Sequence, residues 1–126
     1  LQYSKKITKK EKEQHSEKLK SVLDYIGEHY AEPISIAELA ELCYFSEYHF
    51  MRFFKSAMGT SFTSYLSSYR LSMAARLLLL TNDSILDIAL SCGYENLSYF
   101  NRIFKKRFGQ TPREYRRRQS PDTVHP

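Results

Sequence analysis

The sequence predicts an all-α protein of seven helices. Three observations support this fold class: apolar residues recur at helical spacing along most of the chain, helix-capping residues precede these apolar stretches, and no strand-like alternation persists. With 126 residues, the chain is long enough to bury one modest core. No apolar run approaches the roughly 20 residues that a membrane-spanning helix requires, so we expect no membrane partner.

The first two predicted helices follow a polar segment. Residues 1–18 are rich in Lys and Glu, which predicts a polar linker or tail, or a frayed extension of the first helix. From Leu19 onward, apolar residues recur at helical spacing until Pro33 ends the pattern. Ser35 and Glu38 have the spacing of a capping box, which predicts the start of a short second helix.

The third and fourth predicted helices form the middle of the chain. Ser46 is expected to cap a third helix, which ends near Gly59 because glycine readily adopts the left-handed conformation that ends helices. Ser61 opens a long fourth helix that extends to about Leu80. Its roughly 19 residues correspond to a length of about 28 Å, at about 1.5 Å per residue.

The last three predicted helices have start signals of the same kind. Ser84 is expected to cap a short fifth helix, and Asn96 a longer sixth. The segment 111–114 reads Thr-Pro-Arg-Glu, a capping box with Pro at the first helical position, and it opens the seventh helix. Residues 119–126 are predicted to be a disordered tail, which leaves 19–118 as the folded domain.

The chain contains an internal repeat whose two copies cover about residues 35–59 and 84–109. Equivalent residues lie 49 positions apart before the turn and 50 apart after it, so the second turn has one additional residue. The matching pairs are Ile36/Ile85, Ala40/Ala89, Cys43/Cys92, Phe50/Phe100, Arg52/Arg102, Phe54/Phe104, Lys55/Lys105 and Gly59/Gly109. Each copy reads as a short helix, a tight turn and a longer helix with an aromatic face, which is typical of a helix-turn-helix.

The repeat therefore predicts two helix-turn-helix subdomains joined by the long central helix. In this motif the second helix enters the major groove of DNA, and one duplex turn measures about 34 Å. A stiff spacer of about 28 Å suits two such helices that read adjacent major-groove segments on one DNA face. The alternative is two helical hairpins packed around a core, which does not explain the outward-facing Arg-x-x-Lys of both copies.

The charge balance favours a polyanionic partner. The sequence has 19 Lys and Arg against 14 Asp and Glu, a net charge of +5. Double-stranded DNA fits this charge, although RNA or an anionic membrane surface would satisfy it equally well.

The cysteines and histidines do not form a ligand pattern. Cys43 and Cys92 lie far apart without CxxC spacing, and they take equivalent inward positions where a small apolar residue is needed. The four histidines also lack ligand spacing; they are His15, His29, His49 and His125. We therefore expect no metal, no other cofactor, and a reduced, cytoplasmic protein.

The segment from Ile34 to Arg118 resembles the DNA-binding domain of the AraC/XylS family of bacterial transcription regulators. The strongest match runs from Gly93 to Arg116, GYENLSYFNRIFKKRFGQTPREYR, which is similar to the family's signature over nearly its whole length. The first copy departs from the family pattern at Tyr44, where the family usually has Gly. If that position is left-handed, a non-glycine residue costs on the order of 1–2 kcal/mol. We therefore expect the first turn to differ slightly and to tilt the helix that follows it.

The resemblance implies a sequence-specific transcription regulator of the AraC type that is not an enzyme and lies in the cytoplasm with the nucleoid. It implies activation more often than repression, through a contact with RNA polymerase. We expect that the family's N-terminal effector or dimerisation domain is missing from this sequence and that residues 1–18 are its connecting tail.

The resemblance also places candidate base-contacting residues on the second helix of each copy. In the first copy these are Tyr48, Met51 and Arg52; in the second they are Leu97, Ser98, Tyr99, Asn101 and Arg102. Arginine suits guanine O6 and N7, asparagine suits adenine N6 and N7, and methionine offers only apolar contact. For both arginines, an ion pair or a phosphate contact is the alternative. We expect the second copy to carry most of the sequence recognition.

Other cations are candidates for phosphate contacts, with a merely solvated basic face as the alternative. They are Lys55, Lys105, Lys106, Arg113, Arg116, Arg117 and Arg118.

Two other functions remain open at this point. A helical module of this type also resembles part of alkylated-DNA repair methyltransferases, whose activity needs a reactive thiolate. A nucleic-acid-binding or protein-interaction bundle without specificity would bind nucleic acid with a steep salt dependence and with the same affinity for every sequence.

Overall fold

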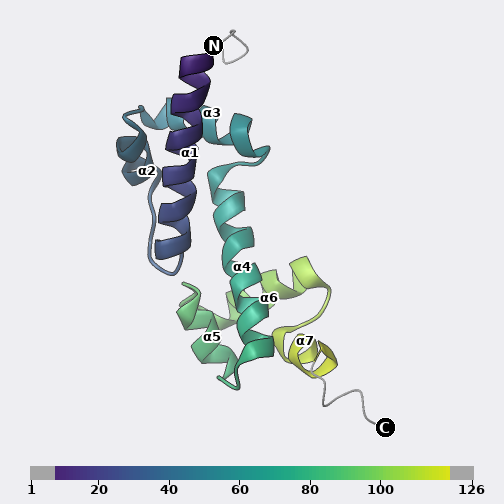
Figure 1. Cartoon of the computed structure of the whole chain (residues 1–126). Coiled ribbons are helices and arrows are strands. Elements are labelled where there is room, and N and C mark those ends of the chain that lie inside the picture. Colours follow the sequence, from purple (N-terminus) through teal and green to yellow (C-terminus); the bar gives the residue numbers. More distant parts are fainter. Residues whose placement is uncertain (1–7, 120–126) are drawn as a thin grey trace. The chain divides into compact units, whose positions relative to one another are not determined.

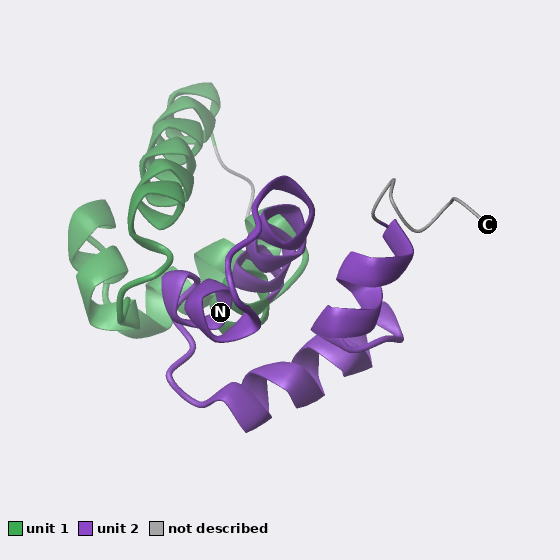
Figure 2. Cartoon of the chain, turned by 90° about the horizontal axis from the view of Figure 1, so that it is seen from below, with its two compact units in different colours: residues 1–67 green, residues 68–126 purple. Residues whose placement is uncertain are grey.

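The computed structural model describes residues 8–119 and contains seven α-helices there, with no β-strand in that range (Figure 1). They are α1 (Lys9–His29), α2 (Ile36–Cys43), α3 (Glu47–Met58), α4 (Phe62–Leu80), α5 (Ile85–Ser91), α6 (Leu97–Phe108) and α7 (Pro112–Gln119). The chain divides into two compact units, unit 1 (residues 1–67) and unit 2 (residues 68–126), so α4 contributes to both (Figure 2). The predicted fold class and number of helices are confirmed.

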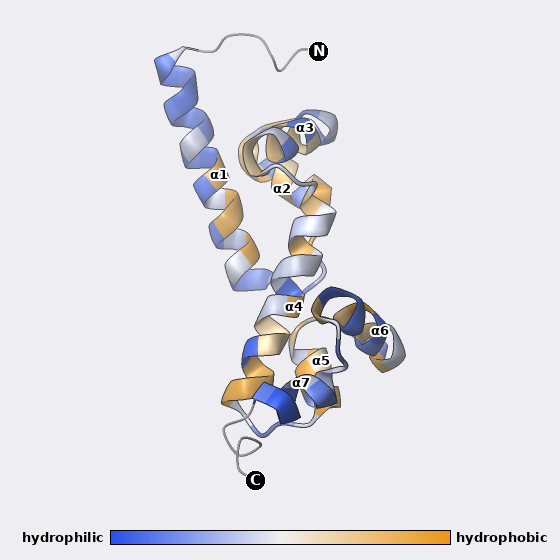
Figure 3. Cartoon of the chain, turned by 90° about the vertical axis from the view of Figure 1, so that its right-hand side faces the viewer, coloured by the Kyte–Doolittle hydropathy of each residue, from blue (hydrophilic) through white to orange (hydrophobic). Residues whose placement is uncertain are grey.

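Helix α1 begins earlier than the apolar pattern indicated. Thr8 and Glu11 form a capping box, in which the Glu11 N–H donates to Thr8 Oγ1 at 3.1 Å and the Thr8 N–H to Glu11 Oε1 at 2.8 Å. The first half of the helix is hydrophilic, and its buried residues Val22 and Ile26 lie in the second half (Figure 3). Residues 9–18 are thus helix rather than linker, while residues 1–7 lie outside the described range.

The predicted start signals of the other helices form as expected. In each case the side-chain oxygen accepts a hydrogen bond from the backbone N–H three residues later, which satisfies one of the unpaired donors of the first turn. The bonds are 3.1 Å at Ser35, 3.0 Å at Ser46, 3.2 Å at Ser61, 3.0 Å at Ser84, 2.8 Å at Asn96 and 3.1 Å at Thr111. The predicted tail begins at Gln119, which is the last residue of α7; residues 120–126 lie outside the described range.

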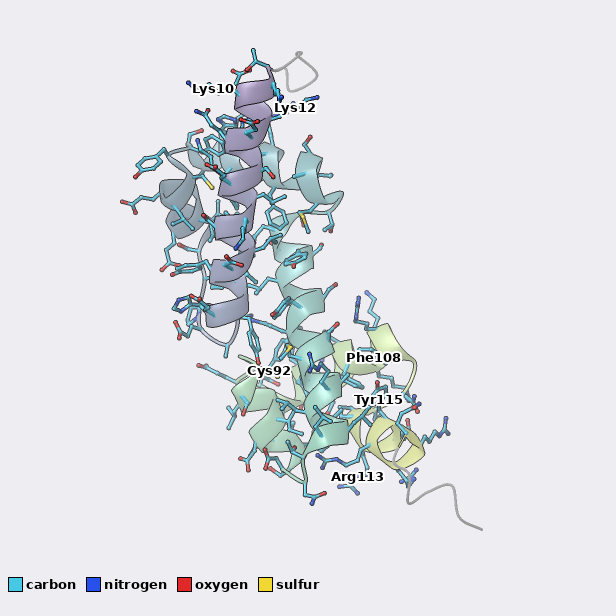
Figure 4. All side chains as sticks on the ribbon, in the orientation of Figure 1. Lys10, Lys12, Cys92, Phe108, Arg113 and Tyr115 are labelled. Carbon is cyan, nitrogen blue, oxygen red and sulfur yellow. The ribbon has the colours of Figure 1, made fainter. Side chains whose placement is uncertain are left out.

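Each unit has a core of aromatic rings supplied mainly by the second helix of its helix-turn-helix, α3 in unit 1 and α6 in unit 2. In unit 1, the fully buried Phe54 lies 5.9 Å from Phe50 and 6.0 Å from Phe62, measured between ring centroids. In unit 2, the fully buried Phe104 lies 5.8 Å from Phe100, 4.5 Å from Phe108 and 5.4 Å from Tyr115. These rings pack one face of α3 and one face of α6 against the core of their own unit, and the opposite face of each helix is exposed to solvent. Figure 4 shows Phe108 of α6 beside Tyr115 of α7.

The turn of unit 1 is left-handed at Tyr44, which has φ 60° and ψ 35°. Its side chain is 90% exposed, so little packing offsets the unfavourable backbone conformation. The equivalent residue of unit 2 is Gly93, with φ 95°. The next N–H in each turn, at Phe45 and at Tyr94, donates over 2.9 Å to the equivalent alanine carbonyl of the preceding helix. Both turns therefore share this hydrogen bond, but their helix ends differ: α2 ends at Cys43 with the left-handed Tyr44 as its C-cap, whereas α5 ends at Ser91 with Cys92 as its C-cap at φ −100°. The expected tilt of α3 stays a prediction.

Replacing Tyr44 with Gly should stabilise unit 1. The left-handed conformation of a non-glycine residue costs about 1–2 kcal/mol, and the entropy of glycine offsets about half of this, so we expect a gain of roughly 0.5–1 kcal/mol. Urea denaturation of both proteins measures this gain. Gly93→Ala is the matched control and should lose about 1 kcal/mol at the equivalent position. An unchanged midpoint for Tyr44→Gly would contradict the expectation.

Candidate nucleic-acid interface

The exposed face of α3 presents the three residues selected from the sequence. Tyr48 is 63% exposed and Met51 is 43% exposed, and Arg52 is also exposed. Arg52 Nη1 donates a 3.1 Å hydrogen bond to Tyr48 Oη, and its guanidinium carbon lies 5.5 Å from the Tyr48 ring centroid. This ring holds the arginine close to the first turn of the helix. The face therefore presents one oriented cation, one phenol and one thioether.

The exposed face of α6 is built on the same plan. Ser98, Tyr99 and Arg102 are exposed, whereas Leu97 and Asn101 are half-buried. The Arg102 guanidinium carbon lies 5.3 Å from the Tyr99 ring centroid. A cation over an aromatic ring is thus present on both second helices, although the tyrosine precedes its arginine by four residues in α3 and by three in α6.

Most of the predicted phosphate-contacting cations are exposed in the described structure. Lys55 lies in the last turn of α3, and Lys105 and Lys106 lie in the last turn of α6. Arg113, Arg117 and Arg118 are exposed on α7. Figure 4 marks Arg113 on that helix. The basic side of unit 2 therefore combines the end of α6 with α7.

Arg116 does not belong with these cations. Its Nε donates to the Leu78 carbonyl over 3.0 Å, and its Nη2 donates to the Thr81 carbonyl over 3.1 Å. Both acceptors lie at the end of α4, where backbone carbonyls lack partners within the helix. Arg116 is half-buried and joins α7 to α4. Because these two bonds hold its guanidinium group within unit 2, we leave Arg116 out of the proposed phosphate contacts.

Sequence reasoning did not select Arg107, although it continues the basic run that begins at Lys105. Arg107 is exposed and its Nη1 donates to Ser68 Oγ over 3.1 Å. Its guanidinium carbon lies 5.7 Å from the Phe108 ring centroid. The run itself was a signal for this residue, which adds a cation to the end of α6.

Both cysteines are completely buried, and Cys92 lies inside unit 2 (Figure 4). Burial raises the pKa of Cys43 above its ordinary value and that of Cys92 to about 11. Nearby cations, Lys18 and Arg70 respectively, oppose these shifts. Both thiols are therefore protonated near neutral pH, and the thiol form is a poor nucleophile.

We expect both thiols to remain unmodified when the native protein is treated with a bulky thiol reagent at pH 7.5. After unfolding in guanidinium chloride, the same reagent should modify two thiols per chain, because denaturation exposes them and restores their ordinary pKa. Rapid modification of either thiol in the native protein would contradict the burial described above. The denatured sample serves as the control for reagent activity.

Neither a metal site nor a membrane-spanning helix is found in the described range. Within 8–119, no three His, Cys, Asp or Glu side chains gather in a way that could hold a metal ion. The same range has no helix with the length and apolar character that a membrane crossing requires. His125 lies outside the described range. The candidate interface consists of the exposed faces of α3 and α6 and the cations around them.

Comparisons with known proteins identify the family of this domain. A family model described as a helix-turn-helix domain matches residues 39–118. The bifunctional transcriptional activator and DNA repair enzyme AdaA of Bacillus subtilis is 37% identical over 106 residues, a match that covers 84% of this chain and 50% of AdaA.

Solved structures that are similar to this chain include two domains of bacterial regulators. The C-terminal domain of AraT, a response regulator from Geobacillus stearothermophilus, has a TM-score of 0.76 and 33% identity, over 82% of this chain and 86% of that one. The DNA-binding domain of AdpA, a global transcriptional factor solved in complex with a target DNA, has a TM-score of 0.73 and 30% identity, over 78% and 88%. The chain spans half or less of the length of the curated relatives it matches.

Proposed function

Because the chain belongs to the AraC family of bacterial transcription regulators, as a helix-turn-helix DNA-binding domain, we propose that α3 and α6 each enter a major groove and read bases there. The observation that carries this proposal is the repeated reading face. Each second helix turns an aromatic face to its core and an arginine held over a tyrosine to solvent. A core does not require an exposed arginine at this position, whereas a groove-reading helix uses arginine to bind guanine.

The proposed readers differ between the two helices. On α3 we assign Tyr48, Met51 and Arg52; on α6 we assign Leu97, Ser98, Tyr99, Asn101 and Arg102. Arginine donates two hydrogen bonds to guanine, and asparagine pairs with adenine, so α6 has two polar readers with defined preferences. The only polar readers on α3 are Arg52 and Tyr48, and these are bonded to each other. This supports a division in which α6 carries more of the specificity.

The proposed phosphate contacts come from cations that flank the reading faces. They are Lys55, Lys105, Lys106, Arg107, Arg113, Arg117 and Arg118, with Arg116 left out for the reason given above. Neutralising phosphates adds affinity for every sequence alike and makes binding strongly dependent on salt. These residues would set the position of the domain on the duplex, and the readers would select the site.

We propose further that the two helices read adjacent major-groove segments on one face of the duplex. The two copies repeat head-to-tail in one chain, so they need no palindromic site. Helix α4 between them has 19 residues, which at about 1.5 Å per residue is comparable to one duplex turn of about 34 Å. Hydroxyl-radical footprinting should show two protected segments about one turn apart on the same face, and a single protected segment would contradict this.

Selection of bound duplexes from a random DNA pool tests the function as a whole. We expect a recovered consensus with two half-sites and an affinity at least about 10³-fold above that for random DNA at physiological salt. A helical bundle without sequence preference would bind with a steep salt dependence and yield no consensus. That outcome would overturn the proposal.

We also propose that this stretch has no repair activity of its own. AdaA is described as both an activator and a repair enzyme, but the match covers only half of it. Repair by thiol transfer needs a reactive thiolate, and both thiols here are buried and protonated. Because the curated relatives are at least twice as long as the matched stretch, we propose that an effector or dimerisation domain and a contact with RNA polymerase complete the regulator.

A further inference from the structure

A cluster of rings joins the first half of α1 to the turn and the reading helix of unit 1. The Phe45 ring stacks on His49 at 3.9 Å between centroids, with 24° between the planes. His15 meets Phe45 at 6.2 Å and Phe53 at 5.4 Å, both edge-on. Lys18 Nζ lies 4.4 Å from the Phe45 centroid. His15 and Lys18 come from α1, Phe45 from the turn, and His49 and Phe53 from α3.

Unit 2 has aromatic rings at the positions equivalent to Phe45 and His49, and neither of them is a histidine. The position of Phe45 is held by Tyr94 and that of His49 by Tyr99, with 6.3 Å between the ring centroids. The cation near the Tyr94 ring is Arg70, at 6.0 Å. A helix-turn-helix of this sequence repeat therefore forms with rings that carry no charge at neutral or mildly acidic pH. The imidazoles of unit 1 are not required by the fold.

We propose that His15 and Lys18 of α1, with His49 of α3, form a proton-sensitive clamp on Phe45 that positions the first reading helix on DNA. This inference rests on the proposed function of α3. His49 follows Tyr48 directly and lies one turn before Arg52, so a change in its packing moves the residues that we assign to base reading. The three polar side chains of the clamp act on the reading helix rather than on DNA.

The charges around His49 determine whether a fall in pH tightens or loosens the clamp. Burial, together with the positive charges of His15 and Lys18, lowers the pKa of His49 below its ordinary value. The turn contributes the uncharged ring of Phe45, which stacks on His49. A group whose pKa is lowered by folding keeps its full contribution to stability above the ordinary pKa of about 6.5, and loses it as the pH falls below that value. Acidification should therefore add a positive charge on His49 close to that of Lys18 and loosen the hold of α1 on α3.

The test measures DNA affinity from pH 7.5 to 5.5 at constant ionic strength, with the duplex recovered from the random pool. Wild-type affinity should fall by roughly threefold or more over this range. His49→Tyr, which copies Tyr99, should bind normally at pH 7.5 and show a flat profile. Lys18→Met keeps most of the apolar stem, removes one repelling charge and should lose less affinity on acidification. His29→Gln is the control, because His29 contacts Tyr25 and Glu32 rather than the clamp.

Footprints at both pH values separate the clamp from general effects. Acidification should weaken protection of one half-site only, the same one that Arg52→Ala weakens. Tighter wild-type binding at pH 5.5 would assign His49 to a phosphate contact and overturn the clamp. A parallel loss in wild type and His49→Tyr, or an equal loss at both half-sites, would also overturn it. Failure to recover any consensus duplex would instead overturn the proposed function itself.

Discussion

Phe104→Ala should reduce the free energy of unfolding of unit 2 by about 3–5 kcal/mol, the usual cost of deleting a fully buried phenylalanine. Phe104 has no exposed surface and lies against Phe100, Phe108 and Tyr115, so a cavity would open where α6 meets α7. A loss of this size is a large part of the total stability of a small folded unit. Thermal unfolding followed by circular dichroism measures it.

The equivalent substitution in unit 1, Phe54→Ala, should have a similar cost, because Phe54 is as deeply buried among its own rings. Since each unit has its own core, each variant should remove protection of one half-site and leave the other partly protected. Phe104→Leu is the matched control and should cost less than about 1.5 kcal/mol, because it keeps most of the volume. Loss of both half-sites in each variant would show that the units fold as one cooperative body.

Arg102→Ala should lower the affinity for the selected duplex by about 1–3 kcal/mol and relax the preference at one base pair. The Arg102 side chain is exposed, and the Tyr99 ring beneath its guanidinium group limits where it can point. Removing an arginine that donates to guanine leaves that base without its hydrogen-bond partner but does not change the contacts made elsewhere. Binding to the selected duplex and to every single-base variant of it measures both effects.

Lys105→Ala is the comparison for Arg102→Ala. Lys105 lies in the last turn of the same helix and is exposed, but we assign it to phosphate. Its loss should weaken binding to selected and random duplexes alike. It should also reduce the slope of log affinity against log salt concentration by about one, as expected for the loss of one phosphate contact. If Arg102→Ala behaved in the same uniform way, Arg102 would be a phosphate contact and not a reader.

Helix starts and the repeat could be predicted because they depend on residues that are close in sequence. A capping oxygen bonds to an N–H three residues later, so Ser46 and Asn96 mark α3 and α6 without reference to the rest of the fold. The start of α1 carried a signal of the same kind in Thr8 and Glu11, but the polar character of residues 9–18 obscured it. Polarity predicts exposure, and an exposed segment can still be helical when its first turn is capped.

Side-chain partners that lie far apart in sequence could not be predicted. Arg116 belongs to a basic run and was assigned to phosphate, whereas the fold brings it to the Leu78 carbonyl, 38 positions away. The same holds for the contact of His15 and Lys18 with Phe45, which links α1 to the turn of unit 1. Composition and spacing describe such residues only as charged or polar.

By itself, the sequence determined the all-α class, the two helix-turn-helix copies, and the residues on the outward faces of α3 and α6. These follow from periodicity and capping, which act within a few residues along the chain. The tertiary structure was needed to show that Tyr44 adopts the left-handed turn and that Arg116 joins α7 to α4. It also showed that burial and the charges of His15 and Lys18 on α1 lower the pKa of His49. The physical reason is that such outcomes depend on which helices pack together, since packing sets the neighbours, the burial and the local charge of each side chain.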